Sequence, residues 1–297
     1  MQIVRMAESD TIKGRGRKGQ PESDSCAAKM AGAACGLAVD IGTTTVVMGL
    51  YDLDSGEKLA GLQEKNSQTL LGADVMMRLM HCQRGSQHTL EQRIREQIQN
   101  MAEQLCDGFC ALEQIKTIAV VGNTTMCHIF LGQDTSGLAG SPFRPAYRGI
   151  YRCKGSDIDL QEMKDTDVIV PAGIDAHVGA DAVSMICALQ LPETKETILA
   201  VDIGTNAEIA LSCKGEISVC SAPAGPAFEG AQISQGMRGE PGAIAGMHIA
   251  RQSGNILLEV IPDDRRNVYP VRGICGSGLI DSIASLRQSG ILQPDGY

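Results

Sequence analysis

An apolar-Asp-Ile-Gly-Thr motif occurs twice in the chain, as VDIGTTTVV beginning at Val39 and as VDIGTNAEI beginning at Val201. The two aspartates, Asp40 and Asp202, lie 162 residues apart. This period is far longer than the roughly 20–50 residues of solenoid and propeller repeats. The repeat therefore predicts a duplicated, two-lobed α/β domain in which the cleft between the lobes is the natural ligand site.

The composition excludes several classes of function. The net charge is −9, and nine Tyr and Phe residues without any Trp are the only aromatics among 297 residues, so a nucleic-acid interface is not expected. No apolar run approaches the roughly 20 residues of a membrane span. The first 25 residues contain no stretch typical of a signal peptide. These features predict a cytoplasmic protein that binds neither nucleic acid nor membrane.

The eleven cysteines do not follow a metal-binding pattern. The chain contains neither a C-x-x-C pair nor the spacing of a plant-type iron–sulfur site. Buried free thiols are the expected state in a reducing compartment. Cys106 and Cys110 are one helical turn apart and could share a metal, but the sequence shows no third ligand near them.

The order of predicted elements is three meandering strands, a helix, a strand, a helix, a strand, a helix, and then a second meander. The long helix is predicted to begin at a Thr89/Gln92 capping box, with a solvated face that includes Glu91 and Arg95. The remaining predictions place strands at 36–42, 44–53, 57–66, 115–122 and 167–173, helices at 123–132 and 177–191, and the second meander at 196–222.

The repeated turn has the chemistry of a polyphosphate site. Asp40 and Asp202 can each support Mg²⁺, which takes few carboxylates and keeps several waters. A glycine after each aspartate lets backbone N–H groups approach an anion closely. The hydroxyl and amide groups that follow can contact phosphate oxygens. The predicted nucleotide-binding residues are Gly42, Thr43, Thr44 and Thr45 in the first copy and Gly204, Thr205 and Asn206 in the second.

The two turns resemble the phosphate-1 and phosphate-2 motifs of the acetate and sugar kinase, heat-shock chaperone and actin superfamily. The resemblance implies duplicated ribonuclease-H-like βββαβαβα lobes, an actin-like ATPase fold. In that fold GADAVSMICALQL occupies the place of the first connecting helix, which often orients the attacking water. Asp181 is the matching acidic candidate and Asp175 the second. A helix N-terminal carboxylate that favours the helix dipole is an equally good reading of Asp181.

Longer phrases resemble the C-terminal domain of the reductive activators of corrinoid proteins. They include VVGNTTMCHIFLG, SAPAGPAFEGAQISQGMRGEPGAI and GICGSGLIDSIA, and the likeness covers residues 36–297. It implies an ATPase module that uses ATP and Mg²⁺ and acts on a corrinoid protein, either a methyltransferase component or a corrinoid iron–sulfur protein. In that family the reaction returns inactive cobalt(II) to cobalt(I). The Gly-rich segment from Pro223 to Gly246, with Glu229 and Arg238, is a candidate loop for contact with the partner.

The chain also departs from this family. The family's N-terminal [2Fe–2S] domain is not expected here, and residues 1–35 are interpreted as a disordered leader. The first lobe is predicted at 36–190 and the second, incomplete, at 191–297. The alternatives are an activator of a 2-hydroxyacyl-CoA dehydratase, with Cys220 and Cys275 as loop cysteines, a small-molecule kinase, or a non-catalytic nucleotide switch. A homodimer is left open.

Overall fold

The computed structural model describes residues 2–4, 34–225, 233–250, 254–262 and 270–296, which form two compact units. Of the described residues, the first unit contains 34–198 and 210–220, and the second contains 2–4, 199–209, 221–225, 233–250, 254–262 and 270–296. Strand β1 (Gln2–Val4) belongs to the second unit. Most of the predicted leader over 1–35 lies outside the described residues. The predicted lobe boundary at residue 191 stays a prediction.

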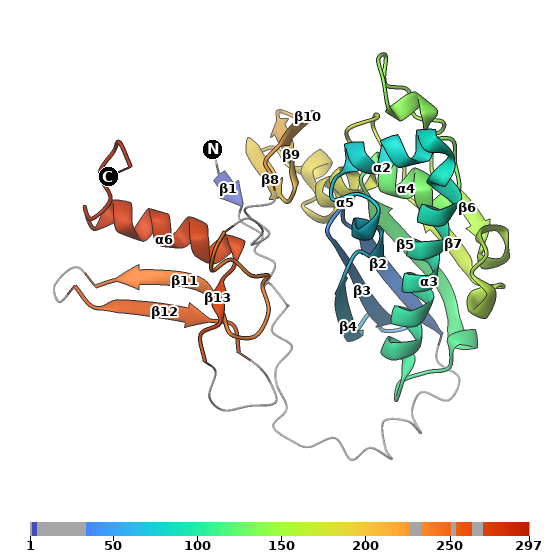
Figure 1. Cartoon of the computed structure of the whole chain (residues 1–297), viewed down its shortest axis with the longest axis horizontal. Helices are drawn as coiled ribbons and strands as arrows, with labels where there is room; N and C mark the ends of the chain where they lie inside the picture. Colours follow the sequence, from blue (N-terminus) through green and yellow to red (C-terminus); the bar gives the residue numbers. More distant parts are fainter. Residues whose placement is uncertain (1, 5–33, 226–232, 251–253, 263–269, 297) are drawn as a thin grey trace. The chain divides into compact units, whose positions relative to one another are not determined.

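A six-stranded sheet in the order β4-β3-β2-β5-β7-β6 is the framework of the first unit (Figure 1). The first three strands form the predicted antiparallel meander, while β5 and β7 run parallel to β2. A strand that was not predicted, β6, pairs with β7 in the antiparallel direction. The strands are β2 (Cys35–Ile41), β3 (Thr45–Asp52), β4 (Lys58–Lys65), β5 (Ile115–Gly122), β6 (Tyr151–Lys154) and β7 (Asp167–Val170).

Four α-helices accompany this sheet: α2 (Val75–His81), α3 (Gln87–Cys106), α4 (Thr124–Leu131) and α5 (Ala180–Ala188). The predicted capping box at Thr89 is wrong, because α3 already begins at Gln87. Its N-cap residue, Ser86, makes no side-chain capping bond. A π-helical turn (Cys82–Ser86) with Gly85 at φ 87° leads from the unpredicted α2 into α3. Short 3₁₀ turns are Ser67–Leu70, Leu112–Gln114, Ser136–Leu138, Gly155–Ile158, Gln161–Met163 and Leu191–Glu193.

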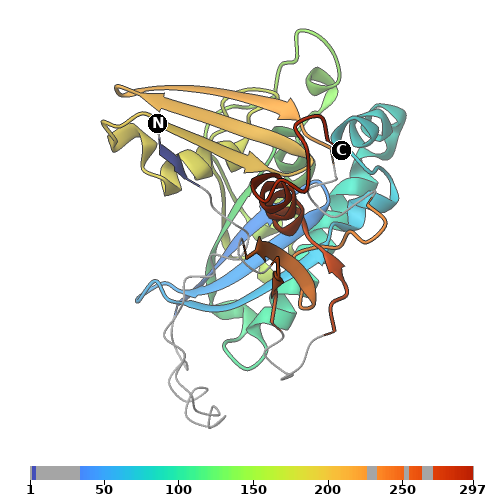
Figure 2. The same ribbon diagram turned by 90° about the vertical axis from the view of Figure 1, so that its left-hand side faces the viewer.

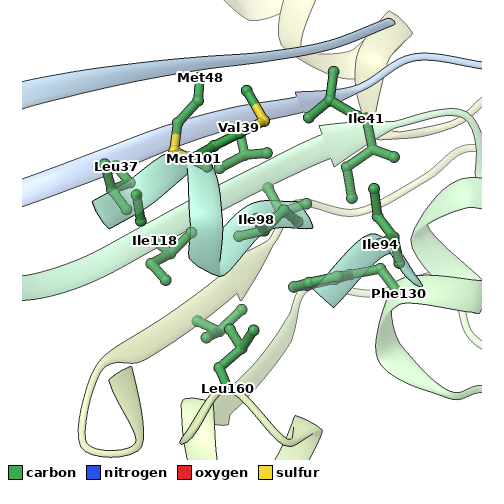
Figure 3. Close-up of a cluster of buried hydrophobic side chains, with 14 of the residues drawn as sticks. Leu37, Val39, Ile41, Met48, Ile94, Ile98, Met101, Ile118, Phe130 and Leu160 are labelled. Atoms are coloured by element: carbon green, nitrogen blue, oxygen red, sulfur yellow. The ribbon is translucent and has the colours of Figure 1, made fainter. Parts of the chain in front are cut away.

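Alternation along β2 determines which side chains face the core. Leu37, Val39 and Ile41 are buried, whereas Asp40 between them is exposed, as the period of two in a strand requires. Figure 3 shows the buried β2 side chains packing among residues of α3 and α4. The other labelled members of this cluster are Met48, Ile94, Ile98, Met101, Ile118, Phe130 and Leu160.

The prediction that Arg95 lies on a solvated face of α3 is wrong. Its side chain is buried, its Nε donates to the Phe130 carbonyl at 2.9 Å, and its Nη1 lies 3.2 Å from an Asp159 carboxylate oxygen. Burial lowers the Arg95 pKa, against the nearby carboxylates of Glu91 and Asp159, which raise it. The guanidinium therefore holds the end of α4 to α3 instead of covering a solvent-facing surface.

A buried histidine, His128, makes the first unit sensitive to acid. Its Nδ1–H donates to the Thr124 carbonyl at 2.7 Å, and its Nε2 accepts from the Ala146 N–H at 3.1 Å. The ring also stacks on Tyr147 with a centroid distance of 4.5 Å. Both ring nitrogens are thus satisfied in the neutral form, and burial lowers the pKa of His128.

We expect the stability of the protein to fall as the pH drops below about 6.5, the ordinary histidine pKa. In that range the unfolded chain takes up a proton at His128 that the folded chain refuses until its own lower pKa is reached. Thermal melts between about pH 7.5 and 5 measure this effect. The His128→Gln variant should lose this part of the pH dependence, and an unchanged pH profile in that variant would contradict the assignment.

The second predicted meander is also present. Strands β8 (Ile198–Ile203), β9 (Asn206–Cys213) and β10 (Glu216–Pro223) follow one another in a four-stranded sheet of order β1-β8-β9-β10. Figure 2 shows β8, β9 and β10 side by side. The turn between β9 and β10 contains Lys214 and Gly215 with φ values of 53° and 85°, left-handed conformations that favour glycine at such turns.

The second unit contains a further small sheet that was not predicted. Strand β11 (Ala243–Ile249) pairs antiparallel with β12 (Ile256–Val260) and parallel with β13 (Gly273–Ile274). Helix α6 (Gly276–Gln288) packs on this sheet. An Asp281 carboxylate oxygen accepts from the Met247 N–H at 2.8 Å. Among the described residues, no helix has the length and apolarity needed to cross a bilayer.

Candidate functional site

The carboxyl ends of parallel strands β2 and β5 bring two turns of the first unit together. Ile41 and Gly122 are register partners at the ends of these strands. A Cβ on Gly122 would lie 2.7 Å from the Ile41 carbonyl oxygen, and Gly122 has a φ of 153°. A Cβ on Gly179, directly before α5, would lie 2.6 Å from the Gly122 oxygen and the Thr124 nitrogen. Glycine at both positions therefore permits the start of α5 to lie against the β5–α4 turn.

Two asparagines hold the predicted phosphate turn at residues 42–45. The Nδ2 of Asn66 donates to the Gly42 carbonyl at 2.8 Å, and the Asn66 N–H donates to the Thr44 carbonyl at 2.8 Å. The Nδ2 of Asn123 donates to the Thr43 hydroxyl at 3.1 Å, while its Oδ1 caps α4. The side chains of Asn66 and Thr43 are buried. The turn is thus fixed by side chains from two other segments before any ligand binds.

A buried arginine lies behind the same turn. The guanidinium of Arg78 donates to the Thr43 carbonyl, to the Gly72 carbonyl at 3.1 Å and to Gln68 Oε1 at 3.2 Å. A further Nη1 contact reaches the sulfur of Met126. Arg78 is fully buried, and burial lowers its pKa to about 10. It therefore keeps its positive charge at neutral pH beside the predicted phosphate-binding residues.

The predicted carboxylates Asp40 and Asp181 share one neighbourhood in the first unit. Both act electrostatically on the buried thiol of Cys127, whose pKa is raised by burial first, then by Asp181 and by Asp40. Asp181 lies in the first turn of α5 and accepts from the Ala182 N–H at 2.7 Å. The fold thus brings together two carboxylates that are far apart in the sequence, beside the turn at 42–45.

The second acidic candidate, Asp175, is engaged elsewhere. Its carboxylate accepts from Arg148 at 2.9 Å and from the Ala176 N–H at 2.9 Å. The Asp175 carbonyl accepts from the Thr124 hydroxyl at 2.7 Å. This residue ties the loop before α5 to the start of α4, which favours a structural role over the water-orienting one.

The second predicted turn, between β8 and β9, closes on itself. The Gly204 N–H donates to the Asn206 carbonyl at 2.8 Å, and the Thr205 carbonyl accepts from the N–H groups of Ala224 and Gly225 at 3.2 and 2.8 Å. In both repeats, the backbone N–H of the residue that follows the third strand donates to a carbonyl of the turn. This residue is Asn66 in the first repeat and Ala224 in the second. Desolvation raises the pKa of Asp202 although its side chain keeps access to solvent.

The residues that support the first turn were not identified from the sequence. Asn123 was detectable as an N-cap residue between a strand and a helix. Arg78 is a single charge among the apolar residues VMMRLMH, which is a weaker signal. The sequence predicted only the residues of the motif. The residues that support the motif lie 24 to 80 positions away along the chain.

The cysteines agree with the predicted thiol state. All ten in the described residues are free, although Cys187 and Cys220 are exposed instead of buried as predicted. Cys106 and Cys110 sulfurs lie 3.6 Å apart, and the thiol of Cys35 lies against Cys110. Burial raises the pKa of Cys35 and of Cys110 to about 11, so these thiols stay protonated.

Over the part of the chain that the structure describes, no group of three or more His, Cys, Asp or Glu side chains could hold a metal ion. Cys275, one of the two cysteines that the dehydratase-activator alternative needs, is buried. Its thiol donates to the Ile244 carbonyl at 3.3 Å, which leaves it poorly placed for a cluster shared between two chains.

The predicted partner loop over 223–246 is only partly described. Glu229 lies outside the described residues, Arg238 is half-buried, and the last residues of the segment belong to strand β11. The loop is therefore shorter than predicted at its C-terminal end. Its role in partner contact stays a prediction.

Two curated proteins that are similar to this chain are both named for corrinoid proteins. The corrinoid activation enzyme RamQ of Eubacterium limosum is 35% identical over 265 residues, which cover 88% of this chain and 43% of RamQ. The [Co(II) methylated amine-specific corrinoid protein] reductase of Methanosarcina barkeri is 29% identical over 282 residues, covering 87% of this chain and 52% of the reductase. The chain thus spans about half the length of these curated relatives.

A solved structure and two family descriptions complete the comparison. The structure of a reductive activator for a corrinoid, iron–sulfur protein matches with a TM-score of 0.79 and 34% identity, covering 89% of this chain and 42% of that one. Residues 35–194 match the RACo middle region, and residues 196–297 match the C-terminal domain of RACo, the ASKHA domain. The fold is the predicted α/β fold of the acetate and sugar kinase, heat-shock chaperone and actin (ASKHA) superfamily, which implies nucleotide binding. The chain belongs to the RACo family.

Proposed function

We propose that this chain is the ATP-binding and ATP-hydrolysing module of a reductive activator that returns a cobalt(II) corrinoid protein to cobalt(I). The relatives are named for corrinoid activation and for reduction of a Co(II) corrinoid protein. Reduction of cobalt(II) to cobalt(I) is strongly uphill, so ATP-driven conformational work on the corrinoid partner gives the nucleotide a role. This work has to be done by elements that respond to the bound phosphates.

The observation that carries the proposal is the construction of the turn at 42–45. The turn begins at Gly42, where an added Cβ would lie 2.6 Å from the Thr45 carbonyl oxygen. Thr43, Thr44 and Thr45 follow this glycine. Fixed backbone and hydroxyl groups beside a buried positive charge form a site suited to phosphate oxygens. We infer that Gly204, Thr205 and Asn206 of the second turn contact the same nucleotide.

Magnesium fits the donors that are present. Asp40 is exposed and is followed in the sequence by Thr43, Thr44 and Thr45, which supply hard oxygen groups of the kind that Mg²⁺ and its waters prefer. We propose that Asp40 and Asp202 support Mg²⁺, which when bound would neutralise charge on the transferred phosphate. Asp181, at the start of α5, is the proposed group that orients the attacking water.

The proposed function is tested with a corrinoid protein in the cobalt(II) state and a low-potential chemical reductant, with and without Mg-ATP. We expect cobalt(I), read from the visible absorption spectrum, to form at least about tenfold faster when both this chain and Mg-ATP are present. The non-hydrolysable analogue of ATP serves as the control for turnover. Formation of cobalt(I) at a rate that is independent of the chain would contradict the proposal.

A further inference from the structure

The guanidinium of Arg78 is a buried positive charge whose hydrogen-bond partners among the described residues are all neutral. It donates to the carbonyls of Thr43 and Gly72 and to the side-chain oxygen of Gln68, and it contacts the Met126 sulfur. Among the described residues no carboxylate lies within 4.0 Å of it; the acidic group that acts on it is Asp74, the N-cap of its own helix. A buried charge without a close counter-charge is costly.

The other buried arginine of the first unit shows the contrast. Arg95 donates to one carbonyl, that of Phe130, and its charge is balanced by Asp159 and by Glu91, with carboxylate oxygens at 3.2 and 4.0 Å. Arg78 makes more hydrogen bonds to neutral groups, yet no ion pair of this kind. Among the described residues, the guanidinium behind the turn at 42–45 is therefore a buried charge without a close carboxylate.

The second repeat indicates what this charge adds. Thr43 and Thr205 occupy the same position of the two motifs, and in both the carbonyl accepts hydrogen bonds from behind the turn. In the second repeat the donors are the neutral N–H groups of Ala224 and Gly225. In the first repeat a guanidinium takes this place. Because neutral N–H groups make this hydrogen bond in the second repeat, the bond alone does not explain why the donor to the Thr43 carbonyl is charged.

We propose that Arg78 is a positioning residue for nucleotide phosphate: it fixes the carbonyl of Thr43 so that the turn faces the phosphates, and it supplies the positive charge that a bound polyphosphate balances. This inference rests on the proposed nucleotide site. Its hydrogen bond also polarises the peptide that joins Thr43 and Thr44, because hydrogen bonds in a chain strengthen one another. Arg78 acts through the turn and does not itself touch the nucleotide.

The test measures Mg-ATP affinity and thermal stability together in the wild type, Arg78→Gln and Arg95→Gln. Arg95→Gln is the matched control, because it also removes a buried guanidinium from a helix of the first unit. We expect Arg78→Gln to weaken Mg-ATP binding by at least about tenfold, the size of one lost charge-assisted interaction. Arg95→Gln should lower the melting temperature but leave the affinity of the remaining folded protein unchanged.

The Arg78→Lys variant separates charge from packing and replaces Arg78→Gln if that variant does not fold. Burial lowers the pKa of an ammonium at such a position from its ordinary value of about 10.4. The substituted side chain should therefore lose its charge as the pH rises, and Mg-ATP affinity should fall between about pH 7 and pH 9. The wild type should keep its affinity over this range, because the pKa of Arg78 is about 10.

Four outcomes decide the inference. A selective loss of affinity in Arg78→Gln, together with a pH-dependent affinity in Arg78→Lys, supports it. Wild-type affinity in both Arg78 variants overturns it and leaves the proposed nucleotide site intact. Equal losses of affinity in the Arg78 and Arg95 variants overturn it in favour of a general loss of stability. A wild type that binds no nucleotide overturns both proposals together.

Discussion

Replacing Asp40 with asparagine is expected to lower ATP hydrolysis by the intact protein at least about tenfold, or roughly 1.4 kcal/mol of barrier. The substitution keeps the size of the side chain but removes the charge that we propose supports Mg²⁺. Asp40 is exposed between buried neighbours on β2, so the melting temperature should change little, as for most surface substitutions. Hydrolysis rates and thermal melts of Asp40→Asn and Asp202→Asn provide the measurement.

Two results would contradict this prediction in different ways. Unchanged hydrolysis in both variants would remove the carboxylates from the mechanism. Lost hydrolysis together with a collapsed melt would mean that the aspartates only stabilise their turns. The Asp175→Asn variant is a useful comparison, because that carboxylate is paired with Arg148 and should affect hydrolysis much less.

Adding a methyl group at Gly179 is expected to displace the backbone of the candidate site. The Cβ would lie 2.6 Å from the Gly122 oxygen and the Thr124 nitrogen and 2.7 Å from the Asn123 carbonyl carbon. These are backbone atoms and cannot rotate away, so the start of α5 must shift. Gly179→Ala should destabilise the protein by about 1–3 kcal/mol and weaken nucleotide binding.

Gly173→Ala is the matched control for this prediction. Gly173 lies in the same loop between β7 and α5, but its Cβ would lie 3.6 Å from the nearest atom, the Val178 oxygen. This distance is an ordinary contact, so we expect a change in stability within about 0.5 kcal/mol. Equal melting temperatures for Gly179→Ala and Gly173→Ala, measured by circular dichroism, would contradict the proposed close approach of α5 to the β5–α4 turn.

The elements with strong local patterns were predictable from the sequence. Both meanders were identified, because apolar alternation and Gly-containing turns define their strands. Helix α4 was predicted at 123–132, and the structure shows that Asn123 and Gly132 cap its two ends. The turn between β2 and β3 was predicted for the same reason, since its aspartate, glycine and threonines are adjacent in the sequence. Its role in phosphate binding stays a prediction.

The elements missed are those whose stability comes from distant partners. Strand β6 has only four residues and exists because β7 pairs with it. Helix α2 has seven residues with an exposed side that includes Met76 and Met77, and one of its two buried residues is Arg78. Strand β12 presents exposed Leu257 and Leu258, so it lacks the alternation of a half-buried strand. Arg95 was misplaced because a buried arginine is recognisable only from its partners.

The most direct test of the nucleotide site is calorimetric titration of the chain with ATP, ADP and AMP, each with and without Mg²⁺. If the two Asp-Ile-Gly-Thr turns contact the β- and γ-phosphates as proposed, ATP and ADP should bind in a Mg²⁺-dependent manner. AMP, which lacks these phosphates, should bind at least about a hundredfold more weakly, or roughly 2.7 kcal/mol. Binding of AMP as tight as that of ATP, or no binding of any of the three nucleotides, would contradict the account.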